Sequence, residues 1–246
     1  MKNIVIVGAT SAIATACARS WAEEGERFVL LARNTTHLEQ VAADLSARGA
    51  AHVTCCALDI NDLSAHAAAL DLCVAELGQL DIVLLAAGTL PDQAACERDV
   101  SLAMREFQTN AVSLIAFLTP LANLLEAQRS GTLAVISSVA GDRGRPSNYV
   151  YGCAKAALST FCDGLRARLF KAGVHVLTIK PGFVDTPMTA GLPLPKMLVA
   201  TPHRVAAEIS RAIDTRRNVL YTPWFWQGIM AVIRSLPEFM FKRASL

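Results

Sequence analysis

The chain has 246 residues and a formal net charge of +2, and 53% of its residues are hydrophobic while 18% are charged. The length is enough for one α/β domain with a sizeable core, and the near-neutral charge gives no basic field of the kind that nucleic-acid binding requires. Hydrophobic residues exceed those of an average soluble domain, so we expect apolar surface that meets a sister subunit, an apolar substrate or a membrane.

The seven cysteines have neither paired Cys-x-x-Cys spacing nor the density of a disulfide scaffold. This usage indicates reduced thiols and predicts no metal site. The first apolar run, 4–7, is far too short for a signal peptide, so we expect a cytoplasmic protein.

Short runs rich in Val, Ile and Leu alternate with longer Ala-rich stretches along the chain. This alternation is typical of a parallel sheet whose crossover helices cover both faces. We predict a single Rossmann-type doubly wound α/β domain over 1–246, with helices that include 11–23 and 38–48 and an amphipathic tail at 224–246. The strands are expected at 4–7, 27–31, 52–57, 81–86, 132–137, 174–180 and 218–221.

The first strand runs directly into a turn of small residues that begins at Gly8. A dinucleotide pyrophosphate binds at such a turn, because backbone N–H groups and a helix N-terminus meet there. Only one of the usual three glycines is present, with Ala12 and Ala14 in place of the others, so a tight turn without a ligand is an equal alternative. The expected contact residues are Gly8, Thr10, Ser11, Ala12 and Ile13.

The second strand ends at Arg33, where an NAD-binding chain usually has an acid. A guanidinium can bind the 2′-phosphate of NADPH bidentately, so the sequence favours NADPH over NADH. The alternative is a solvated surface arginine. After the third strand, Asp59 and Ile60 are candidates for contact with the adenine, although Asp59 could equally cap the next helix.

The stretch 107–125 has no charged residue and approaches the length that spans a bilayer. It contains several polar side chains, Asn110 among them, which would be costly in lipid. We therefore expect a long helix buried in the core or at an interface.

The fifth strand is followed by Ser138, and Tyr151 and Lys155 come thirteen and seventeen positions later. Together with Asn110, the turn at Gly8, and Pro181, Gly182 and Thr186 after the sixth strand, these residues resemble the short-chain dehydrogenase/reductase family over nearly the whole chain. The resemblance implies an NAD(P)-dependent carbonyl reductase with Asn110, Ser138, Tyr151 and Lys155 as its catalytic residues. Its further implied cofactor contacts are Ala87, Gly88, Pro181, Gly182, Val184 and Thr186.

The spacing of Tyr151 and Lys155 is consistent with this chemistry, because residues four apart share one helix face. A nearby ammonium favours the phenolate, so we expect a lowered pKa for Tyr151 and a usable proton donor. By resemblance, Ser138 donates a hydrogen bond to the carbonyl oxygen, Lys155 holds the nicotinamide ribose, and Asn110 holds a water that resupplies the proton. One departure is Leu85-Ala86 where the family frequently has two asparagines, which leaves the finer cofactor contacts open.

Runs at 137–145, 180–189 and 221–226 resemble a bacterial branch that includes the decaprenylphosphoryl-2-keto-erythro-pentose reductases. That resemblance implies reduction of a 2-keto-pentose on a polyprenyl phosphate, the reductive half of an epimerisation in cell wall biosynthesis. A reductase of another keto-sugar or keto-lipid is the main alternative. A non-catalytic NADPH-binding scaffold is a second alternative, disfavoured because a scaffold has no use for a proton donor.

In the tail, Trp226, Ile229, Met230, Ile233 and Leu236 fall on one helical face, and aromatic and basic residues follow. This pattern is typical of a helix on an anionic membrane surface, and packing on a sister subunit in a homo-oligomer is the alternative. On either interpretation, the cofactor site should not depend on residues 224–246.

Overall fold

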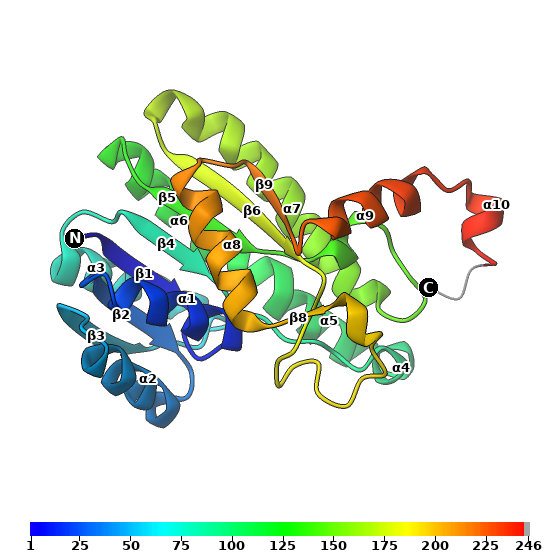
Figure 1. Ribbon diagram of the computed structural model, residues 1–246, viewed down its shortest axis with the longest axis horizontal. Coiled ribbons are helices and arrows are strands. Elements are labelled where there is room, and N and C mark those ends of the chain that lie inside the picture. Colours follow the sequence, from blue (N-terminus) through cyan, green and yellow to red (C-terminus); the bar gives the residue numbers. More distant parts are fainter. Residues whose placement is uncertain (244–246) are drawn as a thin grey trace.

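In the computed structural model, which describes residues 1–243, a seven-stranded parallel sheet forms the centre of the molecule (Figure 1). In the strand order β3-β2-β1-β4-β5-β6-β9, β2 and β3 are added on one side of β1 and the later strands on its other side. The sheet is therefore doubly wound. Every predicted strand is present with its ends within one residue of the expected position, which confirms the predicted fold. The strands are β1 Asn3–Val7, β2 Arg27–Ala32, β3 His52–Ala57, β4 Ile82–Leu85, β5 Thr132–Ile136, β6 His175–Pro181 and β9 Val219–Thr222.

Helices pack on both faces of the sheet and create two hydrophobic cores. Strand β1 shows why, since Ile4 and Ile6 belong to one core while Val5 and Val7 belong to the other. One face is covered by α1 Ala12–Ala22, α2 Thr35–Ala47 and α8 Pro202–Asp214. The other is covered by α3 His66–Leu77, α6 Ser113–Gln128 and α7 Tyr149–Leu169.

The uncharged stretch 107–125 lies within a continuous helical segment, Val100–Gln128, that is long and apolar enough to cross a membrane by length and composition. It consists of α5 Val100–Phe107, one turn of π-helix at Gln108–Val112, and α6. Half of its most apolar window is buried inside the protein, and Leu114, Phe117 and Leu121 are fully inaccessible. These contacts favour the core helix that the sequence predicts.

The remaining segments lie around the carboxyl ends of the strands. Helix α4 Gln93–Arg98 precedes α5, and the Pro-rich segment after β6 forms the small pair β7 Phe183–Val184 and β8 Val199–Ala200. The tail forms α9 Phe225–Ser235 and α10 Glu238–Phe241, drawn in red in Figure 1.

The tail corrects one prediction from the sequence. The face expected to lie on a membrane packs instead against the body of the protein, where Trp226, Met230 and Ile233 are buried together with Val139 and Phe241. The amphipathic pattern is present as predicted. Such a pattern indicates that one helix face is buried, but it does not distinguish burial in a membrane from burial against the protein itself. Arg143 holds the tail in place by donating to the Ile233 and Leu236 carbonyls, at 2.6 and 2.7 Å.

Candidate active site

A cavity of about 480 Å³ opens at the carboxyl ends of the central strands. It collects residues from the turns after β1, β2, β4, β5 and β6 and from the start of α7, which is where doubly wound sheets bind ligands. Of the predicted site residues, all but Asn110 and Asp59 line it. Those that do are Gly8, Thr10, Ser11, Ala12, Ile13, Arg33, Ile60, Ala87, Gly88, Ser138, Tyr151, Lys155, Pro181, Gly182, Val184 and Thr186.

The turn after β1 fits a bound pyrophosphate. Gly8 has a φ of +80°, and a Cβ there would lie 2.5 Å from the Ala87 nitrogen, so only glycine allows the β1 and β4 turns to approach this closely. Ser11 caps α1 by accepting from the Ala14 N–H at 3.2 Å. The N–H groups of Ala12 and Ile13 lie at the helix start, where no intrahelical acceptor exists, and both residues line the cavity. An anion at this place would meet free donors and the positive end of the helix.

Arg33 lies on the cavity wall after β2 and is exposed. Among residues 1–243 it takes part in no ion pair, whereas the neighbouring Asn34 is engaged as the N-cap of α2. An unpaired guanidinium at this edge is available to a phosphate, as the sequence predicts for NADPH.

Asp59 does not reach the cavity. Its carboxylate accepts from the Asn61 N–H at 2.9 Å and so closes the turn that follows β3. The alternative that Asp59 caps the next helix is wrong, because Asp62 is the N-cap of the 3₁₀ turn Leu63–Ala65. Of Asp59 and Ile60, only Ile60 lines the cavity. The sequence did not reveal which aspartate caps the helix, because Asp59 and Asp62 both precede it and Asp favours turns as well as caps.

Ser138 and Tyr151 are brought together by a close approach of two helices. Ser138 caps the 3₁₀ turn Val139–Asp142 by accepting from the Ala140 N–H at 3.1 Å. That turn packs on α7 because glycines occupy both contact points: a Cβ at Gly141 would lie 2.7 Å from the Lys155 carbonyl carbon, and one at Gly152 would lie 2.8 Å from the Ala140 oxygen. The glycines therefore set the spacing between the serine and the tyrosine.

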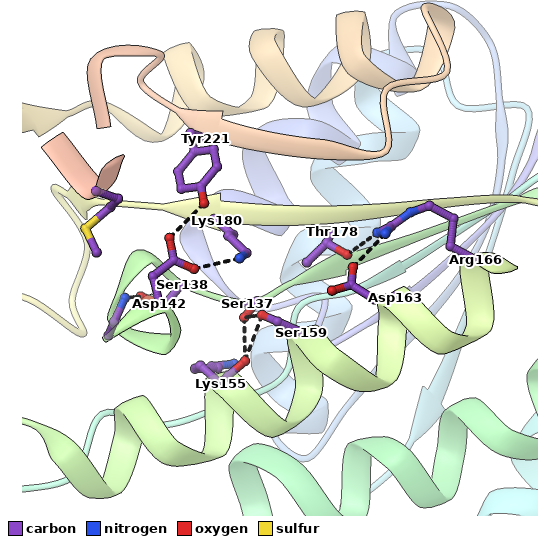
Figure 2. A network of polar contacts seen from close by, with 12 residues as sticks. Ser137, Ser138, Asp142, Lys155, Ser159, Asp163, Arg166, Thr178, Lys180 and Tyr221 are labelled. Carbon is purple, nitrogen blue, oxygen red and sulfur yellow. Dashed lines mark hydrogen bonds and ion pairs between the residues drawn. The ribbon is translucent and has the colours of Figure 1, made fainter. Parts of the chain in front are cut away.

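Polar contacts fasten this arrangement to the sheet (Figure 2). At the end of β5, the Ser137 hydroxyl donates to the Lys155 carbonyl at 3.0 Å, and Ser159 donates to the same carbonyl at 2.8 Å. At the end of the 3₁₀ turn, the Asp142 carboxylate meets the Lys180 ammonium at 2.6 Å and accepts from the Tyr221 hydroxyl at 2.7 Å. The Asp142 side chain is almost fully buried, so these partners satisfy a charge that would be costly alone.

Lys155 is buried next to Tyr151, with its Nζ 5.6 Å from the centre of the phenol ring. Its Nζ donates to the Ile136 carbonyl at 3.3 Å. Burial lowers the pKa of Lys155 to about 8, because the charged form is poorly solvated. Below that pH the ammonium provides a positive charge beside the phenol.

The expected direction of the Tyr151 pKa is wrong for the protein without a ligand. Burial raises the pKa of Tyr151 to about 12, and the Ser138 hydroxyl opposes this only in part. Desolvation of the phenolate thus sets the direction of the shift, and the expected lowering by the Lys155 ammonium is absent. Tyr151 is therefore fully protonated near neutral pH, the form required of a proton donor.

The lowered Lys155 pKa predicts a pH dependence of stability. A lysine has a pKa near 10.4 in an unfolded chain, so between about pH 8 and that value the unfolded state binds the extra proton. The Lys155 contribution to the free energy of unfolding should therefore rise from about pH 8 to about pH 10.4 and be flat below pH 7. Chemical denaturation of wild type and Lys155→Met across this range measures it.

Only the difference between the two proteins is informative, because buried thiols such as Cys17 have a raised pKa and act in the opposite direction. A difference that stays constant from pH 7 to about pH 10.4 would contradict the buried-ammonium assignment.

Asn110 lies behind the cavity wall, in the π-helical turn between α5 and α6. It is fully buried, accepts from the Thr89 N–H at 3.0 Å and donates to the Thr89 hydroxyl and the Glu106 carbonyl, each at 3.0 Å. A Cβ at Gly88 would lie 2.9 Å from its Oδ1 and 3.4 Å from the Lys155 Nζ. Asn110 and Lys155 thus flank Gly88, and π-turns of this kind are frequent at functional sites.

The turn after β6 is held by the tail. A Cβ on Gly182 would lie 1.9 Å from the Trp226 Nε1, so the indole stacks directly on the Pro181–Gly182 turn. Phe183 packs edge-on against the same indole, with ring centres 5.1 Å apart. The expectation that the cofactor site is independent of residues 224–246 is therefore wrong, since α9 supports one of its walls.

Several cavity residues were not singled out from the sequence as parts of a site. They include Thr89, Arg145, Asn148, Phe183, Met188 and Leu192. Arg145 and Asn148 come from the loop that connects the 3₁₀ turn with α7, a loop whose path no periodic pattern reveals. The only available signal was their position between Ser138 and Tyr151.

Metal ligands do not gather anywhere in the described part of the chain. Across residues 1–243, no group of three or more His, Cys, Asp or Glu side chains could hold a metal ion.

Comparison with known proteins gives consistent matches. The family model described as short chain dehydrogenase matches residues 2–195. An uncharacterised oxidoreductase of Mycobacterium tuberculosis is 41% identical over 240 residues, which cover 98% of this chain and 96% of the relative. An uncharacterised oxidoreductase of Streptomyces coelicolor is 36% identical over 246 residues, covering 98% and 95%.

Among solved structures, a single-substitution variant of actinorhodin polyketide ketoreductase with NADPH superposes with a TM-score of 0.80. The match covers 90% of this chain and 95% of the ketoreductase, at 21% sequence identity. At that identity the likeness concerns the fold.

Proposed function

The chain belongs to the short-chain dehydrogenase family, and from this membership and its site we propose that it is an NADPH-dependent reductase that converts a carbonyl group into an alcohol. One observation carries the proposal: Ser138, Tyr151 and Lys155 line the same cavity as the α1 N-terminus and the unpaired Arg33. That cavity therefore offers a proton donor and two anion-binding elements to one bound pair of cofactor and substrate.

The residues of the site divide the chemistry between them. When bound, NADPH supplies the hydride that the carbonyl carbon accepts. Tyr151, protonated near neutral pH, gives its hydroxyl proton to the carbonyl oxygen, and Ser138 donates a hydrogen bond to the same oxygen as its charge grows. The Lys155 ammonium stabilises the phenolate that forms when Tyr151 gives up its proton. Lys155 and Asn110 flank Gly88, and the family resemblance implies that Asn110 holds a water that resupplies the proton.

The first test is oxidation of NADPH, followed with small diketones and keto-sugars as substrates. A reductase consumes NADPH only when a carbonyl compound is present. The scaffold alternative predicts NADPH binding, measured by calorimetry, without turnover of any carbonyl compound. Binding without turnover across a broad ketone panel would favour the scaffold.

Cofactor preference is expected to depend on Arg33. The substitution Arg33→Asp removes a charge-assisted contact with the 2′-phosphate and adds repulsion, which should shift the ratio of kcat/KM for NADPH over NADH by about 30-fold or more. The measurement is the ratio of kcat/KM for NADPH to that for NADH, determined for wild type and for Arg33→Asp.

His37→Asp is a matched control, because His37 lies nearby on α2, is exposed and does not line the cavity. An unchanged ratio in Arg33→Asp, or an equal shift in the control, would reduce Arg33 to a solvated surface residue.

For the natural substrate, we propose a 2-keto-pentose carried on a polyprenyl phosphate. The support is the resemblance of the runs at 137–145, 180–189 and 221–226 to reductases of that substrate, together with the apolar side chains Leu90, Met188 and Leu192 along the cavity. Activity with polyprenyl-phosphoryl 2-keto-pentose above that with a free keto-pentose tests it. Another keto-sugar or keto-lipid reduced faster would replace this substrate.

The proposed location is cytoplasmic, with peripheral contact at the inner face of the membrane and assembly as a homo-oligomer. The membrane part rests on Trp224 and Phe239, which are 73% and 61% exposed, and on the exposed basic residues Lys242 and Arg243. Sizing in solution tests the oligomer. Flotation with anionic liposomes tests the membrane contact, and a protein that never floats would refute it.

A further inference from the structure

Arg145 presents a buried guanidinium in the wall of the cavity. It is only 8% exposed, yet among residues 1–243 it takes part in no ion pair. Its Nη2 lies 3.2 Å from the Met230 sulfur, a weak acceptor, and its Nε has no acceptor at all. A buried arginine with so few hydrogen-bond acceptors and no ion pair is unusual, because buried charges are normally paired.

The nearest candidate counter-charge is already engaged. Asp142 binds Lys180 and Tyr221 on its two carboxylate oxygens, and it reaches Arg145 only as a weaker field that partly offsets desolvation. Arginine keeps its charge in proteins, so Arg145 cannot escape the cost by losing a proton. The structure thus keeps a cation in the cavity wall without an internal partner.

A second unsatisfied atom lies in the same loop. The Asn148 Oδ1 is buried without a donor, and Asn148 lines the cavity just before α7 begins. The Asn148 side chain makes no capping bond to α7, and its NH2 group is the part of the amide that can donate to an anion. The loop therefore carries a guanidinium without a charged partner and an amide whose Oδ1 is unsatisfied.

This loop belongs to the substrate end of the cavity. It connects Ser138 to Tyr151 beside β5, whereas Arg33 follows β2, and β1 and β4 lie between those strands. Three steps of roughly 4.8 Å separate the two strands, about 14 Å in all. Arg145 and Arg33 therefore address different ligand groups.

We propose that Arg145, assisted by Asn148, is an anion subsite for the substrate, so that the enzyme acts on ketones that carry a phosphate or carboxylate group near the carbonyl. This inference rests on the proposed reductase function and narrows its substrate class. A guanidinium binds either anion bidentately, and it does so most strongly in a partly desolvated wall.

Paired ketones test the proposal and separate the two anions. Dihydroxyacetone phosphate is compared with dihydroxyacetone, and acetoacetate with its ethyl ester, all with saturating NADPH. Wild type should have the higher kcat/KM for the anionic member of at least one pair. In Arg145→Met that preference should fall roughly 10- to 100-fold, and Arg145→Lys should retain part of it.

Arg204→Met is the matched control, because it removes a half-exposed arginine on α8 that pairs with Glu208. Its preference should equal that of wild type. If Arg145→Met lowers kcat/KM equally for anionic and neutral ketones, Arg145 has only a structural role and the inference is wrong.

Phosphate binding provides a second readout, and its wild-type measurement stays informative if Arg145→Met does not fold. With NADP⁺ bound so that Arg33 is occupied, inorganic phosphate should bind in calorimetry and should inhibit reduction of neutral ketones competitively. If the enzyme reduces neutral ketones, is unaffected by phosphate and shows no preference for anionic ketones, the proposed anion subsite is wrong and the proposed reductase function still holds. Phosphate binding that Arg145→Lys retains and Arg145→Met loses, without turnover of any ketone, supports the subsite and overturns the reductase.

Discussion

Replacing Tyr151 by Phe should lower kcat for ketone reduction by at least about 10²-fold, the usual contribution of a positioned acid. The change removes one hydroxyl from a side chain that lines the cavity beside Ser138 and close to the Lys155 ammonium. The phenyl ring keeps the packing, so NADPH affinity and the free energy of unfolding should stay close to those of wild type. Steady-state kinetics and calorimetry measure these quantities.

Tyr149→Phe is a closely matched control, since Tyr149 begins the same helix but is 45% exposed and does not line the cavity. It should turn over at the wild-type rate. Near-normal turnover by Tyr151→Phe, or an equal loss in both variants, would remove Tyr151 from the role of proton donor.

Trp226→Ala should lower the free energy of unfolding by about 3–5 kcal/mol, the range for large aromatic side chains removed from a core. Trp226 is 3% exposed and packs against Val139, Met230 and the Pro181–Gly182 turn. Such a loss is a large part of the roughly 5–15 kcal/mol that stabilises an ordinary domain. NADPH affinity should fall as well, because the turn after β6 loses its support.

Trp224→Ala is the natural comparison, being two residues away and 73% exposed, and its effect on stability should stay within about 0.5 kcal/mol. Urea denaturation and NADPH titration of both variants measure the contrast. Equal, small effects of the two substitutions would mean that α9 is an appendage, as the membrane interpretation of its apolar face required.

Local patterns in the sequence predicted the strands and the helix that carries Tyr151 and Lys155. Buried parallel strands such as Ile4–Val7 are continuous apolar runs, and the four-residue spacing of Tyr151 and Lys155 is visible without a structure. What α9 packs against was not predictable, because an apolar stripe is the same whether a membrane or the Gly182 turn covers it.

The electrostatics of the site were equally hidden. The sequence indicates that Lys155 is near Tyr151, but the sign of the Tyr151 pKa shift depends on how far burial has removed water from both groups. The role proposed for Arg145 was not predictable from the sequence for a related reason. A sequence shows an arginine but not whether it has a partner, and that absence is what makes Arg145 informative.

The contact between Trp226 and Gly182 also orders events during synthesis. A nascent chain that has emerged only through residue 200 already contains the glycine turn, Arg33 and the Ser138, Tyr151 and Lys155 group. It still lacks β9, the strand that pairs with β6, and the indole that closes over the Pro181–Gly182 turn. Tight cofactor binding should therefore begin once α9 has left the ribosome, because the cavity wall at Gly182 is complete only then.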